Sequence, residues 1–364
     1  MFDINFFKNC RDIKKGILDK HASLSVSEIY NAFEGYRSKV PFVFNIETTN
    51  ACNMECIMCP RPKLMKRKLQ HMQMGLFEKI ISQVLPHSDS GLNNFWKFVV
   101  GEYAIKPEER SENAFYFYTI SKSLVLHGYG EPPLDPYITE RIALCSKYSI
   151  PTYFSCVPAN IDVEKFRQMM QAGLGVIKFA IDALDDATQK KIRGAHNDFT
   201  NSYKKICDLI ELKSKDRSIK TQIVIPMLEL SQDKEHLKMM QDFMRLWRGK
   251  PVFAYIKSQD NRWFHEEDPE VTYKPHYATQ YCEFPWTSLT IMADGSVVPC
   301  TQDYNCEMKL GDANIQPLAQ IWNSQVYDDF RRWHIKGNFP KGYKCMSRCD
   351  LKLVCDRIKE KKSG

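Results

Sequence analysis

Short apolar runs alternate with amphipathic helical stretches from Pro41 onward, and this alternation restricts the fold more than any other property of the sequence. Strands and helices in this order build a parallel sheet with helices outside, so we expect an α/β fold, either open or curled into a partial barrel. Catalytic residues of such folds lie at the carboxyl ends of the strands. The predicted strands are 42–47, 123–129, 151–155, 176–182, 221–226 and 252–257, and the predicted helices lie near 75–85, 136–147, 162–172, 199–213 and 233–246.

The remaining segments do not share this alternation. Near the start of the chain, Ser25 and Glu28 have the spacing of a capping box and predict a helix start. An aromatic-rich segment between the first helix and the second strand is too long for a simple connection, so it is read as a lid, a partner surface or a packed decoration. The predicted order is a helical extension (1–40), the barrel (41–258, with the insertion at 87–119), a linker (259–281) and a metal-stabilised module (282–364).

Composition excludes several classes of protein. Hydrophobic residues make up 43% and charged residues 26% of the chain, as in folded globular proteins rather than disordered or fibrous ones. The sequence has no run of 18 uncharged apolar residues, and residues 1–16 lack the apolar core and cleavage site of a signal peptide. We therefore expect a cytoplasmic protein with no membrane span. A net charge of +7 is modest, and no basic block interleaved with aromatics indicates a nucleic-acid partner.

Thirteen cysteines in such a chain indicate metal or iron–sulfur ligation, because the cytosol keeps thiols reduced. Cys52, Cys56 and Cys59 directly follow the first predicted strand with the spacing C-x3-C-x2-C. A loop this short can place three thiolates on three corners of a [4Fe–4S] cubane, which usually takes four cysteine ligands. With no fourth cysteine nearby, one iron stays open to another ligand, as in a reactive metal centre. A zinc site is the alternative, although this spacing is uncommon for zinc.

The cysteine loop, its place after the first strand and the six β-α units resemble the radical S-adenosylmethionine (radical SAM) superfamily. The resemblance implies a partial (β/α)6 barrel in which the amino and carboxylate groups of S-adenosylmethionine chelate the open iron. It also implies reductive cleavage of S-adenosylmethionine to a 5′-deoxyadenosyl radical that abstracts hydrogen from a substrate. An external one-electron reductant, such as flavodoxin or ferredoxin, is the implied partner.

Several other residues match the superfamily's S-adenosylmethionine site. The hexapeptide 127–132 resembles its Gly-Gly-Glu motif, in which glycines permit close backbone approach and Glu131 accepts hydrogen bonds from an ammonium. The segment 180–183 resembles its Ser-Ile-Asp segment, with Ala180 in place of serine. Arg193 matches an arginine that pairs with the carboxylate of S-adenosylmethionine. The implied cofactor contacts are Met58, where an aromatic residue is common, together with Gly128, Gly130, Glu131, Ser155, Asp182, Arg193 and Gln222.

A second group of cysteines lies near the end of the sequence. Asp294 and Gly295 stand between two apolar runs and predict a β-hairpin that leads to Cys300. The order of these elements resembles the SPASM and twitch modules of radical SAM enzymes, which carry one or two auxiliary iron–sulfur clusters. Two fully ligated cubanes need seven or eight cysteines, and this region has six, so one auxiliary [4Fe–4S] cluster is expected; a structural zinc is the alternative. Its expected ligands are Cys282, Cys300, Cys345 and Cys349, with Cys355 as the substitute, whereas Cys306 stands where relatives commonly have another residue.

The groups that would meet a substrate are less distinctive. Asn45, Lys178, Tyr255 and Lys257 are candidates for inward-facing positions on strands. His127 and Asp303 are candidate proton acceptors.

The size of the C-terminal module is the only guide to the substrate. Relatives with a reduced module include dehydrogenases of amino-sugars and aminocyclitols, so the resemblance implies a small-molecule substrate of carbohydrate or aminocyclitol type, which is dehydrogenated or epimerised. A maturase of ribosomal peptides is the second hypothesis. A non-catalytic iron–sulfur electron carrier is the third, although a carrier would not need the open cysteine loop or the motif at Gly128–Glu131.

Overall fold

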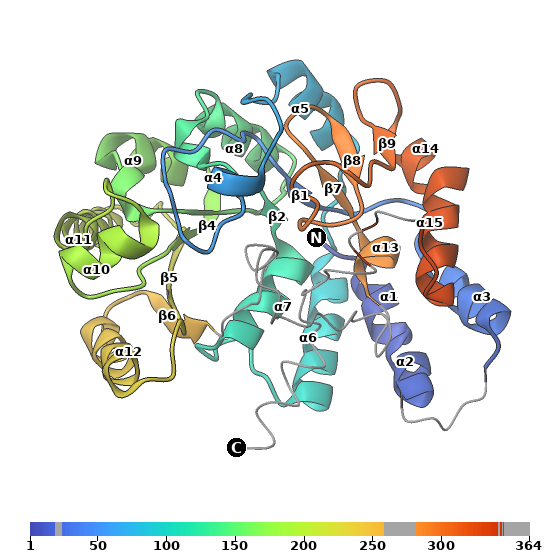
Figure 1. Ribbon diagram of the computed structural model, residues 1–364, viewed down its shortest axis with the longest axis horizontal. Coiled ribbons are helices and arrows are strands. Elements are labelled where there is room, and N and C mark those ends of the chain that lie inside the picture. The colour runs from blue at the N-terminus through green and yellow to red at the C-terminus, as the bar shows by residue number, and fades with distance from the viewer. Residues whose placement is uncertain (19–23, 258–281, 341–342, 344, 346–364) are drawn as a thin grey trace.

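The computed structural model describes residues 1–18, 24–257, 282–340, 343 and 345 of the chain (Figure 1). Within these residues a single sheet runs in the order β6-β5-β4-β3-β2-β1-β7-β8-β9, parallel from β6 through β7 and antiparallel thereafter. Its first six strands confirm the predicted partial barrel. They are β1 (Val43–Ile46), β2 (Leu124–Val125), β3 (Thr152–Cys156), β4 (Leu174–Phe179), β5 (Gln222–Leu228) and β6 (Phe253–Lys257).

Helices cover the outer face of this sheet. On α9, Phe166, Met169 and Met170 are buried at helical spacing, and Phe166 packs against Phe154 of β3 and Phe179 of β4. The outer helices are α5 (Met74–Ile81), α8 (Ile138–Lys147), α9 (Val163–Gln171), α10 (Asp186–Arg193), α11 (Phe199–Lys215) and α12 (Lys234–Trp247), with short 3-10 turns at Pro132–Leu134 and Pro158–Asn160.

The insertion at 87–119 forms most of two further helices, α6 (Asp89–Tyr103) and α7 (Glu112–Lys122), which lie together beneath the inner side of the sheet in Figure 1. Because side chains alternate along a strand, the inner face carries a set distinct from the outer core. Phe115 of α7 packs edge-on against Tyr153 of β3, with ring centroids 5.4 Å apart, and also contacts Phe253 and Tyr255 of β6. The aromatic insertion therefore fills part of the barrel interior.

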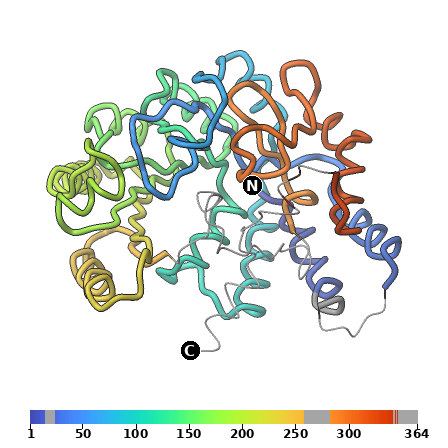
Figure 2. Tube along the Cα trace, in the orientation of Figure 1, coloured from blue at the N-terminus to red at the C-terminus, as the bar shows by residue number. Residues whose placement is uncertain are grey.

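The N-terminal helices pack against the C-terminal part of the chain, as Figure 2 shows by the blue segment beside the red one. These helices are α1 (Ile4–Asn9), α2 (Arg11–Leu18) and α3 (Val26–Tyr36), and Ser25 and Glu28 form the predicted capping box at the start of α3. Phe6 and Phe33 pack on Trp286, and Tyr30 donates a hydrogen bond to Asp328 of α15 (Gln325–Lys336). Sequence-distant helices thus share one core.

The predicted hairpin is present. Its strands are β7 (Leu289–Ile291) and β8 (Ser296–Val298), and Gly295 has a positive φ of 88° in the turn between them. Since β7 pairs in parallel with β1, the hairpin continues the barrel sheet. Short β9 (Gly311–Asp312), α13 (Phe284–Thr287) and α14 (Leu318–Trp322) complete this region.

The linker expected at 259–281, and both Cys349 and Cys355, lie outside the described residues. In the part of the chain that the structure describes, no helix combines the length and apolarity that crossing a bilayer requires.

Candidate active site

A cavity of about 490 Å³ opens at the carboxyl ends of the barrel strands, where the parallel sheet was expected to place its active site. Its walls come from the cysteine loop after β1, the glycine-rich turn after β2 and the ends of β3 to β6. Most of the predicted site residues line it together. They are Cys52, Cys56, Met58, Cys59, His127, Gly128, Gly130, Glu131, Ser155, Asp182 and Arg193.

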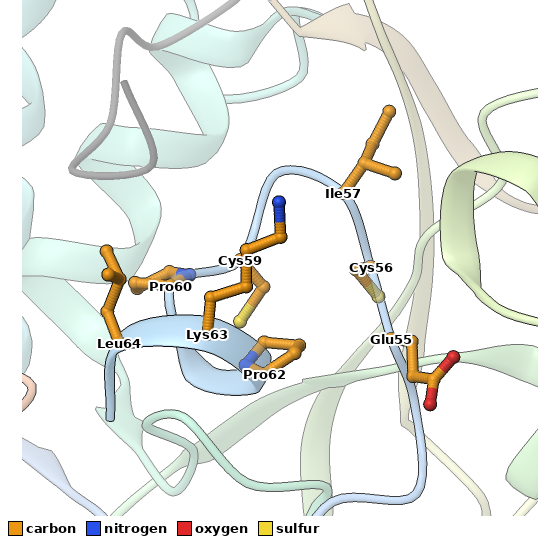
Figure 3. A pocket seen from close by; sticks show the side chains of 8 residues that line it. All are labelled: Glu55, Cys56, Ile57, Cys59, Pro60, Pro62, Lys63 and Leu64. Atoms are coloured by element: carbon orange, nitrogen blue, oxygen red, sulfur yellow. The ribbon is translucent and has the colours of Figure 1, made fainter. Parts of the chain in front are cut away.

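The cysteine loop is held by backbone hydrogen bonds at both ends of its turn. The Cys59 amide donates to the Cys56 carbonyl at 3.1 Å, and the Ile57 amide donates to the Ile192 carbonyl at the end of α10 at 3.0 Å. Figure 3 shows Cys56 and Cys59 on the two arms of this turn, with Ile57 near its tip and the short helix α4 (Arg61–Leu64) following Pro60. These contacts fix the loop beside the cavity.

The donor set fits an iron–sulfur cluster. Three thiols face one cavity, and soft thiolates are the ligands that such clusters take from proteins. Burial raises the pKa of the Cys52 thiol to about 12 and also raises that of Cys56, although Arg193 opposes the shift at Cys56. Burial therefore disfavours the thiolate forms of these residues, and a bound metal cation would favour them.

The glycine-rich turn needs its glycines because the loop after β1 approaches it closely. A Cβ on Gly130 would lie 2.2 Å from the Thr49 carbonyl oxygen, and one on Gly128 would lie 2.5 Å from a carboxylate oxygen of Glu47. The Glu131 amide also donates to the Ala51 carbonyl at 2.8 Å. The turn and the cysteine loop are thus fitted to each other without room for a side chain.

Glu131 points its carboxylate into this fitted region. One oxygen accepts hydrogen bonds from the Val157 amide at 3.0 Å and from the Asn160 side chain at 3.1 Å. Burial raises the pKa of Glu131 to about 7, against the effect of those two hydrogen bonds. A nearby ammonium would favour the carboxylate form, as expected for a residue that receives the amino group of S-adenosylmethionine.

Asp182 and Arg193 form a largely buried pair that also lines the cavity. The Arg193 guanidinium donates to one Asp182 oxygen, while the other oxygen accepts from the Leu228 amide at 2.9 Å. A second guanidinium nitrogen lies 3.8 Å from the Cys56 sulfur. Arg193 thereby brings positive charge to the side of the cavity that holds the thiols.

Three predicted residues differ from their expected roles. Gln222 does not line this cavity: it begins β5 and lines a separate cavity with Trp96, Phe115 and Phe253, because Leu228 is at the end of that strand that faces the main cavity. Gln222 therefore lies at the end of β5 that points away from this cavity.

The two candidate proton acceptors, His127 and Asp303, accept hydrogen bonds from backbone amides. The Nδ1 atom of His127 accepts the Ser155 amide at 3.2 Å, so in the neutral ring Nε2 carries the proton and serves as a donor. Both oxygens of Asp303 accept amides of its own turn, from Glu307 at 2.9 Å and Met308 at 2.8 Å, and Asp303 does not line the cavity. The geometry therefore does not support either residue as the proton acceptor.

The described cysteines of the second group do not all contact the same core: Cys345 packs against the main outer core, whereas Cys282 and Cys300 lie on the inner side. Cys282 and Cys300 both pack against the inner aromatic cluster, and both are near the buried hydroxyl of Tyr327, whose pKa burial and these thiols raise. The Cys345 sulfur lies 3.9 Å from the Met308 sulfur. Cys282 and Cys300 therefore share the same surroundings, and their role as ligands of an auxiliary cluster stays a prediction.

The sequence reading missed Glu47 and Arg67. The fully buried Glu47 carboxylate receives both guanidinium nitrogens of Arg67, at 2.7 and 2.8 Å, and the amides of Tyr129 and Ala293, at 3.1 and 3.3 Å. Arg67 also donates to the Tyr304 carbonyl at 2.6 Å. Glu47 could have been noticed as a charge directly after β1, whereas nothing in the sequence marks Arg67.

Comparisons with known proteins agree with this geometry. A family model described as "Radical SAM superfamily" matches residues 46–243, more than half of the chain, and one described as "Iron-sulfur cluster-binding domain" (SPASM) matches residues 282–350. Comparison with curated proteins finds no match.

Two solved structures show the same fold at low sequence identity. Streptococcus suis SuiB bound to precursor peptide SuiA is 15% identical with a TM-score of 0.52, over 98% of this chain and 86% of that one. Native anSMEcpe with bound AdoMet is 14% identical with a TM-score of 0.53, over 88% of this chain and 95% of that one. BtrN in complex with AdoMet and 2-DOIA is 13% identical with a TM-score of 0.46, over 80% of this chain and 86% of that one.

Proposed function

Because this chain belongs to the radical SAM superfamily and carries a SPASM-type iron–sulfur domain, we propose that Cys52, Cys56 and Cys59 hold the [4Fe–4S] cluster that binds S-adenosylmethionine. When bound and reduced, this pair of cofactors supplies the 5′-deoxyadenosyl radical that abstracts a hydrogen atom from the substrate. The observation that carries the proposal is the convergence of the three thiols, Glu131 and Arg193 on one cavity.

The protein's own residues bind and orient the cofactor in this proposal. Gly128 and Gly130 let the backbone approach the methionine part, and Glu131 accepts hydrogen bonds from its amino group. Arg193 balances negative charge near Cys56, and Asp182 holds Arg193 in place. We also propose that Cys282, Cys300 and Cys345 contribute to one auxiliary cluster, in a module that begins at residue 282.

For the substrate we propose a small molecule of carbohydrate or aminocyclitol type, which is dehydrogenated or epimerised. The cavity of about 490 Å³ has to hold the cofactors as well as the substrate, which favours a small substrate. The aromatic residues of α7 also occupy the inner side of the barrel, which limits how far a bulky substrate can enter.

The cofactor assignment is tested by replacing Cys52, Cys56 and Cys59 with alanine. Anaerobically reconstituted and reduced wild-type protein is expected to form 5′-deoxyadenosine, and the triple variant is expected to form none while it keeps its auxiliary iron. Cys207→Ala is the matched control, because Cys207 lies on α11 apart from both cysteine groups. Cleavage that persists in the triple variant would refute the assignment, and a wild-type protein that never cleaves would favour an electron carrier.

The substrate class is tested by isotope transfer. A perdeuterated cell extract is separated into a low-mass carbohydrate fraction and a peptide fraction, and each is incubated with the reduced holoenzyme. Deuterium in 5′-deoxyadenosine with the carbohydrate fraction alone is the expected result, because the radical takes hydrogen directly from the substrate. Deuterium only with the peptide fraction would replace the proposal with a peptide maturase.

A further inference from the structure

We propose that Asn160 is a positioning residue, which orients the Glu131 carboxylate toward the amino group of S-adenosylmethionine and, through Asn53, links that carboxylate to the cysteine loop. The inference rests on the proposed function, since it concerns the cofactor that the same cavity would hold. It is carried by the hydrogen bonds that join these three side chains, by the anchored turn that holds Asn160 and by the carboxylate oxygen that the bonds leave unused.

Both hydrogen bonds to the Glu131 carboxylate reach the same oxygen. The Val157 amide donates to Oε2 at 3.0 Å, and the side-chain amide of Asn160 donates to it at 3.1 Å. From the residues that the structure describes, no donor reaches Oε1, although Glu131 lines the cavity. Since an ionised carboxylate can accept hydrogen bonds on both oxygens, Oε1 is the atom that can receive an ammonium group.

The backbone around Asn160 is anchored independently of Glu131. Asn160 ends a 3-10 turn that begins at Pro158, shortly after β3, and the proline ring restricts the backbone at the start of this turn. The Lys205 side chain of α11 donates a hydrogen bond to the Ala159 carbonyl within the turn at 2.8 Å. The Asn160 side chain therefore extends from a fixed backbone, as a residue that orients a neighbouring carboxylate must.

Two reciprocal hydrogen bonds join Asn160 to the cysteine loop. The Asn53 side chain donates to Oδ1 of Asn160 at 2.8 Å, and Nδ2 of Asn160 donates to Oδ1 of Asn53 at 3.0 Å. Asn53 stands between Cys52 and Cys56, two of the three cysteines proposed to hold the cluster. Because Nδ2 carries two hydrogens, Asn160 can donate to Asn53 and to Glu131 at the same time. The proposed receptor of the amino group is thereby connected to the loop that carries the thiols.

The test measures the binding of two ligands to reconstituted holoenzyme without reductant, by equilibrium dialysis. One ligand is S-adenosylmethionine, and the other is 5′-methylthioadenosine, which lacks the amino and carboxylate groups of methionine. Asn160→Ala is expected to weaken binding of S-adenosylmethionine about tenfold or more, because a charge-assisted contact loses its positioning. Binding of 5′-methylthioadenosine is expected to stay within about twofold of wild type, whereas a general distortion of the cavity would weaken both ligands alike.

Asn201→Ala is the matched control. Asn201 lies on α11 outside the cavity, and its side chain donates to the Asp198 carboxylate at 3.0 Å, so the variant removes an equivalent bond and should bind both ligands as the wild type does. Asn53→Ala is expected to weaken S-adenosylmethionine binding by a smaller factor than Asn160→Ala, because the bond from Asn160 to Glu131 remains. Asn160→Leu, which is similar in shape but has no donor, is the second variant should alanine impair folding.

Two results would overturn the inference: an Asn160 variant that binds S-adenosylmethionine like the wild type, or one that loses affinity for both ligands by the same factor. An Asn53→Ala variant that binds like the wild type would overturn the link to the cysteine loop. The outcome is separable from that of the proposed function. If the wild type cleaves S-adenosylmethionine and the Asn160 variants keep their affinity, only the role of Asn160 is refuted. A wild type that binds S-adenosylmethionine but never cleaves it refutes the radical chemistry, whatever the affinities show for Asn160.

Discussion

Replacing Arg67 with methionine should destabilise the protein substantially, because it leaves the buried Glu47 carboxylate without its counterion. The Glu47 carboxylate is fully buried, and the Arg67 side chain is only 10% exposed. In the variant the carboxylate keeps the amides of Tyr129 and Ala293 but loses two charge-assisted hydrogen bonds. It must then either stay charged without a counterion or take up a proton.

The size of the effect follows from the burial. Removing one partner of a buried ion pair costs about 3–5 kcal/mol, and the two remaining amides favour the lower end, about 3 kcal/mol. With an unfolding entropy of about 2.1 cal/mol/K per residue, a chain of 364 residues would lose about 4 °C in Tm if it unfolds as one unit. Glu47→Gln combined with Arg67→Met should recover part of this loss, since no charge remains buried.

Thermal unfolding followed by circular dichroism measures the shift. The control is Arg167→Met, which breaks the exposed pair of Arg167 with Glu164, and it should leave the Tm unchanged. Melting of Arg67→Met within about 1 °C of wild type would refute the reasoning. If the double variant is no more stable than Arg67→Met alone, the unpaired Glu47 carboxylate is not the cause of the destabilisation.

Two further predictions concern the glycine-rich turn and the acid stability of the fold. Gly130→Ala should abolish binding of S-adenosylmethionine in equilibrium dialysis, because its Cβ would lie 2.2 Å from the Thr49 carbonyl oxygen; Gly101→Ala, with no atom within 4 Å of its Cβ, should bind normally. Burial lowers the pKa of His87 to about 4, so between pH 6.5 and 4 the unfolded chain binds more protons and stability falls as the pH falls, by up to about 3 kcal/mol. Urea unfolding of His87→Phe at pH 7 and pH 5 should show a smaller loss than wild type, and an equal loss would contradict the assignment to His87.

The regular part of the fold could be predicted because local pattern and burial agree there. β5 and β6 were expected at 221–226 and 252–257 and run over Gln222–Leu228 and Phe253–Lys257. Helix α10 was not expected, since its eight residues include only two buried ones. The placement of the insertion inside the barrel could not be read from the sequence, because aromatic residues pack equally well on either face of a sheet.

The sequence indicated which residues meet at one cavity where a motif places them in one short loop. Cys52, Cys56 and Cys59, and likewise Gly128 to Glu131, converge because each group occupies one short loop at a strand end. The prediction for Gln222 came from no motif and placed it at the wrong cavity, because a single residue does not indicate which end of its strand faces the site. The Asp182–Arg193 pair was expected as two separate contacts and is a single unit.

The Glu47 side chain connects the loops around the cavity to one another. Its carboxylate joins the end of β1 to the glycine-rich turn through Tyr129, to the hairpin through Ala293 and to the chain after the cysteine loop through Arg67. Tyr129 also packs edge-on against Tyr304, which lies four residues after Cys300, with ring centroids 5.6 Å apart. Since β1 pairs directly with β7, the cavity at the strand ends and the hairpin cannot move apart without breaking both the sheet and the Glu47–Arg67 pair. The strand before the cysteine loop and the hairpin before Cys300 are therefore anchored to each other in one sheet.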